Sequence, residues 1–210
     1  MAQATGLGRR QADRLIKQGR VDINGKTAEL GSSVDNKKLV RLDGKLLQPK
    51  ATRTILLNKP AGYVVSRRGQ GSKTVYDLLP QGLRELKPVG RLDKDSSGLL
   101  LLTNDGQLAE NLTHPSKNKQ KIYRLALDKE ISKEALDRLS KGVPLEDGIS
   151  RLSVLRVYKR VEMTVAISEG RNRQIRRTLE ALGYTVVKLH RTEFGDYSLG
   201  ELKPGKWKTV

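Results

Sequence analysis

The chain contains no cysteine among its 210 residues. This absence excludes disulfide bonds, thiolate catalysis and zinc sites with cysteine ligands, and it is compatible with a cytoplasmic protein. Only two histidines, His114 and His190, are present, too few for a histidine-based cluster, so we expect no metal. No apolar run approaches the roughly 20 residues that span a bilayer, and the N-terminus lacks the hydrophobic segment of a signal peptide. We therefore expect no membrane association and a cytoplasmic location.

Positive charge is in large excess. The chain carries 41 Lys and Arg against 23 Asp and Glu, a formal net charge of +18. Such an excess favours a polyanionic partner, and without a membrane segment nucleic acid is the leading one. The length allows one medium domain, or one medium and one small domain.

The first part of the chain predicts a small basic module. Residues 7–18 form an amphipathic helix, with an apolar face and a cationic side that includes Arg10, Arg14 and Lys17. Short strands follow at residues 21–24, 38–42 and 45–47, with tight turns at Asn24-Gly25 and Asp43-Gly44. Residues 1–53 carry a net charge of +7.

Residues 48–53 are polar and marked by a proline, and they predict a linker between domains at 1–47 and 54–210. Beyond the linker, strands are predicted at residues 54–58, 62–66, 99–103, 122–127, 152–158, 162–167 and 185–191. Helices are predicted at residues 75–79, 107–113, 133–141 and 173–182, with Ser132 as the N-cap of the third. Hairpins mixed with helices predict an α+β domain on a largely antiparallel mixed sheet flanked by helices.

The glycine-bounded loop before the apolar run Leu99-Leu-Leu-Leu102 is the leading catalytic candidate. It places Asp93 between the basic residues Arg91 and Lys94. Flanking positive charge keeps a carboxylate ionised, and anchoring by a buried strand holds it in place. The alternative interpretation is an ordinary polar turn before a strand.

Three other segments carry candidate residues, each with a structural alternative. Tyr123 follows a polar, basic approach, although a tyrosine on a strand usually belongs to the core. Residues 171–177 contain four arginines, which alone predict a basic helix face. A turn at the end of a strand is predicted at Lys59-Pro60-Ala61-Gly62.

In order along the chain, these motifs resemble the RsuA/RluB family of ribosomal RNA pseudouridine synthases with an N-terminal S4 domain. Gly90-Arg-Leu-Asp93 with Ser97-Gly-Leu-Leu100 resembles the catalytic signature of that family. Lys59-Pro-Ala-Gly62, Lys121-Ile-Tyr123 and Glu169-Gly-Arg-Asn-Arg-Gln-Ile-Arg-Arg177 resemble its other motifs. Residues 9–44 resemble the S4-type RNA-binding domain, although the S4 domain of this family usually begins with an extra helical turn.

The resemblance implies a role for each matching residue. Asp93 is the essential catalytic carboxylate, Tyr123 packs against the target base, and Arg176 pairs with Asp93. RNA contacts are expected from Arg91, Arg171, Arg173, Arg177 and Lys59 in the catalytic domain, and from Arg9, Arg10, Arg14 and Lys17 in the S4 domain. The Lys59 motif is expected to contribute mainly as a structural turn.

The implied activity is isomerisation of a specific uridine to pseudouridine, with the base flipped out of the RNA. Substrate and product contain the same atoms, so we expect no cofactor. The expected partner is ribosomal RNA or a pre-ribosomal particle, bound by a monomer, and the Arg-Asn-Arg-Gln-Ile-Arg-Arg segment favours large-subunit 23S rRNA. Whether Asp93 acts as a nucleophile or as a base stays open.

Two other classes are compatible with parts of the sequence. A non-catalytic S4-domain protein for RNA binding or ribosome assembly needs the basic surface but not Asp93, Tyr123 and Arg176. A nucleoside hydrolase or glycosylase usually needs a second acid or a metal, and in the Asp93 loop the second carboxylate is Asp95.

Overall fold

The computed structural model describes residues 1–35, 38–48 and 50–210. Contacts between Cα atoms divide the chain into two compact units. The first comprises Met1–Arg53 with Asn104–Gly106, and the second comprises Thr54–Thr103 with Gln107–Val210. The predicted linker at 48–53 includes Pro49, which lies outside the described residues.

The first unit contains helices α1 (Ala2–Thr5) and α2 (Arg9–Lys17) and a small antiparallel sheet. Its strand order is β2-β1-β3-β4, with bounds β1 (Val21–Ile23), β2 (Lys26–Thr27), β3 (Val40–Leu42) and β4 (Lys45–Leu46). At both tight turns the two central residues have positive φ, as two-residue hairpin turns of this type require. The sequence-predicted helix and turns are therefore confirmed, and the helix begins two residues later than expected.

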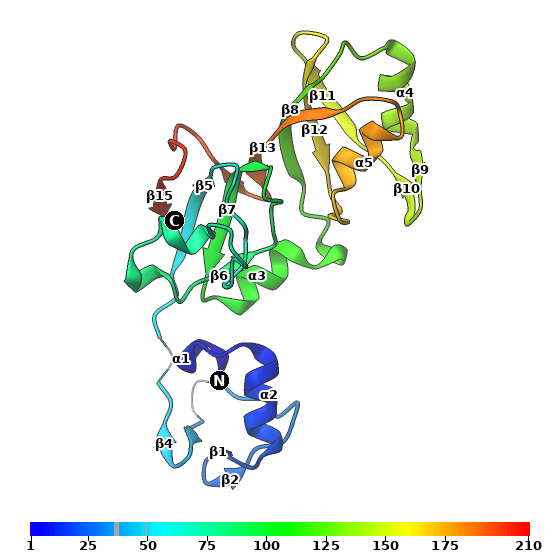
Figure 1. Cartoon of the computed structure of the whole chain (residues 1–210). Coiled ribbons are helices and arrows are strands. Elements are labelled where there is room, and N and C mark those ends of the chain that lie inside the picture. Colours follow the sequence, from blue (N-terminus) through cyan, green and yellow to red (C-terminus); the bar gives the residue numbers. More distant parts are fainter. Residues whose placement is uncertain (36–37, 49) are drawn as a thin grey trace. The chain divides into compact units, whose positions relative to one another are not determined.

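The second unit is built on a nine-stranded mixed sheet (Figure 1). The path through the sheet is β11-β12-β8-β13-β7-β5-β15, with β14 on β13 and β6 on β7. The bounds are β5 (Thr54–Lys59), β6 (Lys87–Val89), β7 (Ser97–Thr103), β8 (Lys121–Leu127), β11 (Ser153–Val157), β12 (Glu162–Ile167), β13 (Val186–Phe194), β14 (Tyr197–Ser198) and β15 (Trp207–Thr209). All these pairings are antiparallel except that of β13 with β7, so the predicted mixed, largely antiparallel sheet is confirmed.

Helices and one hairpin flank this sheet. The helices are α3 (Gly106–Thr113, which begins at the last residue assigned to the first unit), α4 (Lys133–Lys141) and α5 (Gln174–Glu180). The hairpin is formed by β9 (Val143–Leu145) and β10 (Gly148–Ser150), and short 3-10 turns occupy Val75–Leu78, Gln81–Leu83 and Pro115–Lys117. Figure 1 shows α4, α5 and the hairpin beside β8, β11 and β12. Ser132 caps α4 as predicted, because its Oγ accepts the Ala135 N–H at 3.1 Å.

The apolar run in β7 is buried on both faces of the sheet. Leu100 and Leu102 belong to the larger core cluster, which also contains residues of α4 and α5. Leu99 and Leu101 belong to a second cluster that contains Leu112 of α3. A strand that is covered on both faces has a continuous run of hydrophobic residues rather than an alternating pattern. The Asp93 loop leads directly into this buried strand, which fixes the position of the loop's C-terminal end.

Several sequence expectations for this unit need correction. The predicted strand at 62–66 does not form; of this segment only Val64 bridges another residue, Thr74. The sequence also missed β6, β9, β10, β14 and β15, which are two or three residues long, too short for a periodic signal. No helix in the described part of the chain is long and apolar enough to cross a bilayer.

Candidate active site

A pocket of about 840 Å³ opens beside the loop between β6 and β7. Among its lining residues are Asp93, Tyr123 and Arg173, which come from this loop, from β8 and from the start of α5. Arg91 also lines the pocket and is exposed. The predicted catalytic loop, the tyrosine and one arginine of the basic segment therefore meet in one place.

The side chain of Lys59, at the end of β5, anchors the loop that carries Asp93. This side chain is fully buried, and its ammonium group donates to the carbonyls of Asp93 at 3.0 Å and Ser96 at 2.6 Å. Longer contacts reach the carbonyls of Pro60 at 3.1 Å and Lys94 at 3.4 Å. Burial lowers the pKa of Lys59 to about 8, while the charges of Asp95 and Asp93 act in the opposite direction. The expectation that Lys59 contacts RNA is wrong, because its ammonium group is enclosed by the loop it supports.

Gly98 fixes the point where the loop joins the sheet. Its φ is +106°, and a Cβ there would lie 2.2 Å from the carbonyl oxygen of Arg191. Gly98 lies in the parallel pairing of β7 with β13, which places Ser97 opposite His190 and Gly98 opposite Arg191. Only glycine allows this close approach of the two backbones.

The arginine nearest to Asp93 is Arg173, not Arg176. Arg173 Nη1 lies 3.6 Å from Asp93 Oδ2, and the side chain of Asp93 is 35% exposed. Arg176 instead forms an ion pair with Asp95, with Nη2 3.2 Å from Oδ2, and donates to the backbone carbonyls of Asp95 and Val186. It is not among the residues that line the pocket. The predicted Arg176–Asp93 pair is therefore wrong.

Asp95 joins the two arginines. Arg173 donates to both carboxylate oxygens of Asp95, at 3.1 and 3.2 Å, and Arg176 contacts one of them. Burial alone would raise the pKa of Asp95, but the hydrogen bonds from Arg173 and the charge of Arg176 outweigh it and hold the pKa below its usual value. Arg173 precedes α5 in a left-handed backbone conformation and Arg176 lies in its first turn, and both side chains reach the same carboxylate. Asp95 thereby sets the position of the arginine that faces Asp93.

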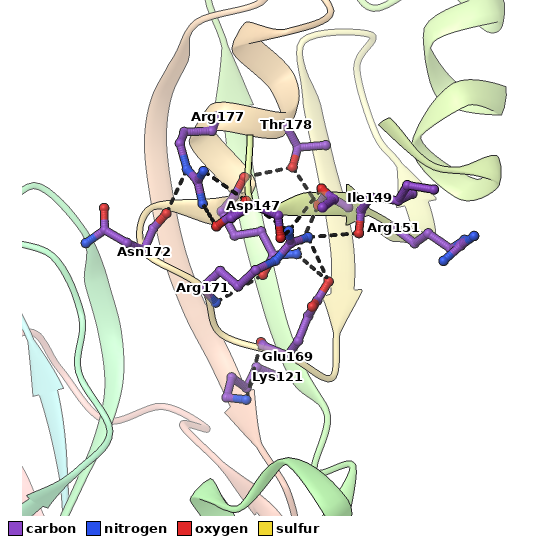
Figure 2. Close-up of polar contacts among 12 residues, drawn as sticks. Lys121, Asp147, Ile149, Arg151, Glu169, Arg171, Asn172, Arg177 and Thr178 are labelled. Atoms are coloured by element: carbon purple, nitrogen blue, oxygen red, sulfur yellow. Dashed lines mark hydrogen bonds and ion pairs between the residues drawn. The ribbon is translucent and has the colours of Figure 1, made fainter. Parts of the chain in front are cut away.

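A second carboxylate binds the other two arginines of this segment. Figure 2 shows Arg171 and Arg177 converging on Asp147 in the turn between β9 and β10. Arg171 donates to the Asp147 carboxylate at 2.9 Å and to the carbonyls of Gly148 and Ile149. Arg177 donates to both carboxylate oxygens of Asp147, at 3.1 and 2.7 Å.

This network changes the role expected of Arg171 and Arg177. The hydrogen bond from Arg177 is the main reason why the pKa of Asp147 lies below its ordinary value. Both arginines fasten the β9–β10 hairpin to the start of α5, and the side chain of Arg171 is only 19% exposed. The structure thus gives both arginines a structural role, and their predicted contact with phosphates stays a prediction. Arg91 and Arg173 keep exposed guanidinium groups at the pocket.

The S4-type candidates lie in the first unit. Arg9, Arg10, Arg14 and Lys17 are all on α2 and exposed. Within the part of the chain that the structure describes, none of the four forms an ion pair. Their proposed contact with RNA stays a prediction.

Asp95 and Asp147 offer a matched pair of variants, since each carboxylate forms ion pairs with two arginines between residues 171 and 177. We expect Asp95→Asn to slow the reaction about 5- to 10-fold, equivalent to about 1 kcal/mol for a half-exposed pair. Asp147→Asn should loosen the hairpin and leave the rate nearly unchanged. Single-turnover rates and thermal unfolding of both variants test this. Equal rate losses in the two variants would mean that Asp95 has no special link to Asp93.

A carboxylate among cationic side chains, in a pocket on a strongly basic chain, is typical of an enzyme that acts on nucleic acid. Comparison with known proteins identifies the family. The family model described as RNA pseudouridylate synthase matches residues 53–181. This chain therefore belongs to the RNA pseudouridine synthase family, and it is an RNA pseudouridine synthase, an isomerase.

Similar proteins cover nearly the whole chain. An uncharacterized RNA pseudouridine synthase of Aquifex aeolicus is 36% identical, over 100% of this chain and 88% of that protein. Ribosomal large subunit pseudouridine synthase B of Vibrio cholerae is 39% identical, over 99% of this chain and 68% of that protein. A crystal structure of a pseudouridylate synthase matches with a TM-score of 0.73 and 30% identity, over 100% of this chain and 93% of that one.

Proposed function

We propose that this protein converts a specific uridine of large-subunit ribosomal RNA to pseudouridine through Asp93. The observation that carries the proposal is the Asp93 carboxylate, which lines the pocket with Arg173 at 3.6 Å. The relatives in Vibrio cholerae and Bacillus subtilis named ribosomal large subunit pseudouridine synthase B support the choice of RNA.

The reaction rearranges bonds within one nucleotide. The bond between ribose C1′ and uracil N1 breaks, the base turns, and a bond forms between C1′ and C5. The C5 proton is lost and N1 gains a proton, so no redox partner or group donor is consumed. An ionised Asp93, facing Arg173, is suited to act at the sugar, either on C1′ or as a base beside it.

The target base must leave the RNA helix to reach Asp93. A pocket of about 840 Å³ is within the range of about 300–1,000 Å³ that encloses small ligands. Tyr123 is positioned in its wall to pack against the uracil, a contact worth about 1–3 kcal/mol. Arg91 and Arg173 are suited to bind the adjacent phosphates at the opening.

We further propose that residues 1–47 are an S4-type RNA-binding domain, joined by residues 48–53 to a catalytic domain at 54–210. The exposed cations of α2 support this assignment, because they supply affinity for a phosphate backbone without reading its sequence. The protein would act as a monomer on ribosomal RNA or on a pre-ribosomal particle.

Mapping pseudouridines across both ribosomal RNAs tests the proposed substrate. A strain without this protein should lack one large-subunit pseudouridine, which returns with the wild-type protein and not with Asp93→Asn. Loss of a small-subunit pseudouridine instead would contradict the choice of RNA. An unchanged map would contradict the proposed substrate altogether.

The α2 cations can be tested in the full-length protein. Replacing Arg9, Arg10, Arg14 and Lys17 by Gln should weaken binding to ribosomal RNA and make it less sensitive to salt. Each phosphate contact that is lost should reduce the slope of log affinity against log salt by about 0.7–0.9. An unchanged slope would show that this helix is a solvated surface that does not touch RNA.

A further inference from the structure

The wall of the active-site pocket contains a buried guanidinium group that forms no ion pair in the described part of the chain. Arg191 of β13 is only 1% exposed. Its Nε donates to the carbonyl of Leu99 at 2.8 Å, and its Nη1 lies 3.5 Å from the Tyr123 hydroxyl. Its Nη2 is buried and has no hydrogen-bond partner among the residues that the structure describes. A buried charge with an unused donor is costly, so in a native protein it calls for an explanation such as a ligand.

The nearby carboxylates are engaged elsewhere. Asp93 faces Arg173, and Glu169 accepts from Arg171 and Gln174. No ion pair of Arg191 is found among the described residues. The free donor of Arg191 is therefore not balanced by an acidic side chain of the pocket.

A second cation lies close to the first. Arg191 and Lys121 both stand over the ring of Phe194, at 4.9 and 5.2 Å from its centre, and all three residues line the pocket. Burial lowers the pKa of Lys121, and the charge of Arg191 lowers it further. This end of the pocket favours a ligand atom that carries or gains negative charge.

From this arrangement we propose that Arg191 binds a carbonyl oxygen of the flipped uracil and stabilises the negative charge that the base gains in the reaction. The proposal rests on the proposed function. Because Arg191 is buried in the wall of the pocket, we expect a base that enters the pocket to reach it, and a phosphate of the RNA backbone to stay at the opening. When the C1′–N1 bond breaks, its electron pair stays on the base and spreads from N1 to the carbonyl oxygens. A guanidinium only donates hydrogen bonds, and at the buried position of Arg191 it interacts more strongly with this anion than with neutral uracil.

A substrate with a more stable leaving base tests this role. Fluorine at C5 withdraws electrons and stabilises the pyrimidine anion, so breakage of its glycosidic bond should depend less on Arg191. We expect Arg191→Gln to slow consumption of the target uridine about 10²-fold. The loss should be at least about tenfold smaller when the target is 5-fluorouridine, because less stabilisation is needed. Single-turnover rates follow from digestion of the RNA and mass spectrometry of its nucleosides.

Arg191→Lys keeps the charge and should retain more activity than Arg191→Gln. Arg67→Gln is a matched control, because Arg67 also donates to backbone carbonyls and stands over an aromatic ring, Tyr76, without lining the pocket. Any loss of single-turnover rate in Arg67→Gln should be the same for the RNA with uridine and for the RNA with 5-fluorouridine at the target position. Equal losses in Arg191→Gln on both RNAs would overturn the proposal, as would loss of the fold in both Arg191 variants. An inactive wild-type protein on ribosomal RNA would instead refute the proposed function.

Discussion

Asp93→Asn should abolish isomerisation while leaving affinity for RNA within a few-fold of the wild type. The substitution keeps the shape of the side chain and removes its charge and basicity, which the reaction at the sugar requires. We expect the single-turnover rate to fall by about 10³-fold or more, as for other residues that act directly on the bonds being changed. Binding should persist, because the phosphates are expected to contact cationic side chains such as Arg91 and Arg173, which the substitution leaves in place.

The control for this variant is Asp147→Asn, the same change at a carboxylate that binds arginines in the β9–β10 hairpin. It should keep nearly full activity. Pseudouridine formation on a target RNA and RNA affinity are measured for both variants. Substantial turnover by Asp93→Asn would refute the catalytic assignment and leave Asp93 as an ordinary loop residue.

The sequence predicted where the pocket lies but not how its ion pairs are arranged. Asp93 and Tyr123 were found from short motifs whose order along the chain is informative, and both line the pocket. The partner of Asp93 was assigned wrongly. Two carboxylates two residues apart and two arginines three residues apart allow several pairings, and only the three-dimensional course of the loop selects one.

Arg191 was missed although the sequence carried a signal. In β13, Leu189 and Arg191 are buried and His190 between them is only partly so, which is the alternation of a strand. A positive charge at an inward position of such a strand is rare without a partner. A charged residue at this inward position therefore identifies Arg191 as a candidate site residue.

Lys59 could not be assigned from local sequence. A lysine next to Pro60 at the end of a strand is predicted to be exposed. Apart from the carbonyl of Pro60, however, its partners are carbonyls 34 to 37 residues further along the chain. Two of these carbonyls have other donors, since Ser96 N–H reaches Asp93 O and Gly62 N–H reaches Lys94 O. The carbonyls of Pro60 and Ser96 depend on Lys59 in this cluster. The lysine thus connects β5 to the catalytic loop.

Lys59→Met should destabilise the protein by about 2–5 kcal/mol and remove most of its activity, because buried carbonyls lose their donor and the Asp93 loop loses its anchor. Chemical denaturation and single-turnover rates measure the two effects. Lys141→Met, which removes an exposed lysine paired with Asp137, is the control and should change neither by much. Unchanged stability and activity in Lys59→Met would contradict the anchoring role.

The pH dependence of stability gives a second test of Lys59. Burial lowers its pKa from 10.5 to about 8 in the folded protein, so between these two values the unfolded chain binds more protons. The contribution of Lys59 to the free energy of unfolding must then rise with pH across this window. Activity should fall over the same window, because the neutral amine has one hydrogen fewer for the loop carbonyls. Comparing the wild type with Lys59→Met from pH 7 to 10.5 isolates this group. If the stability difference between the two proteins stays constant with pH, then Lys59 does not titrate in the folded state as its burial requires.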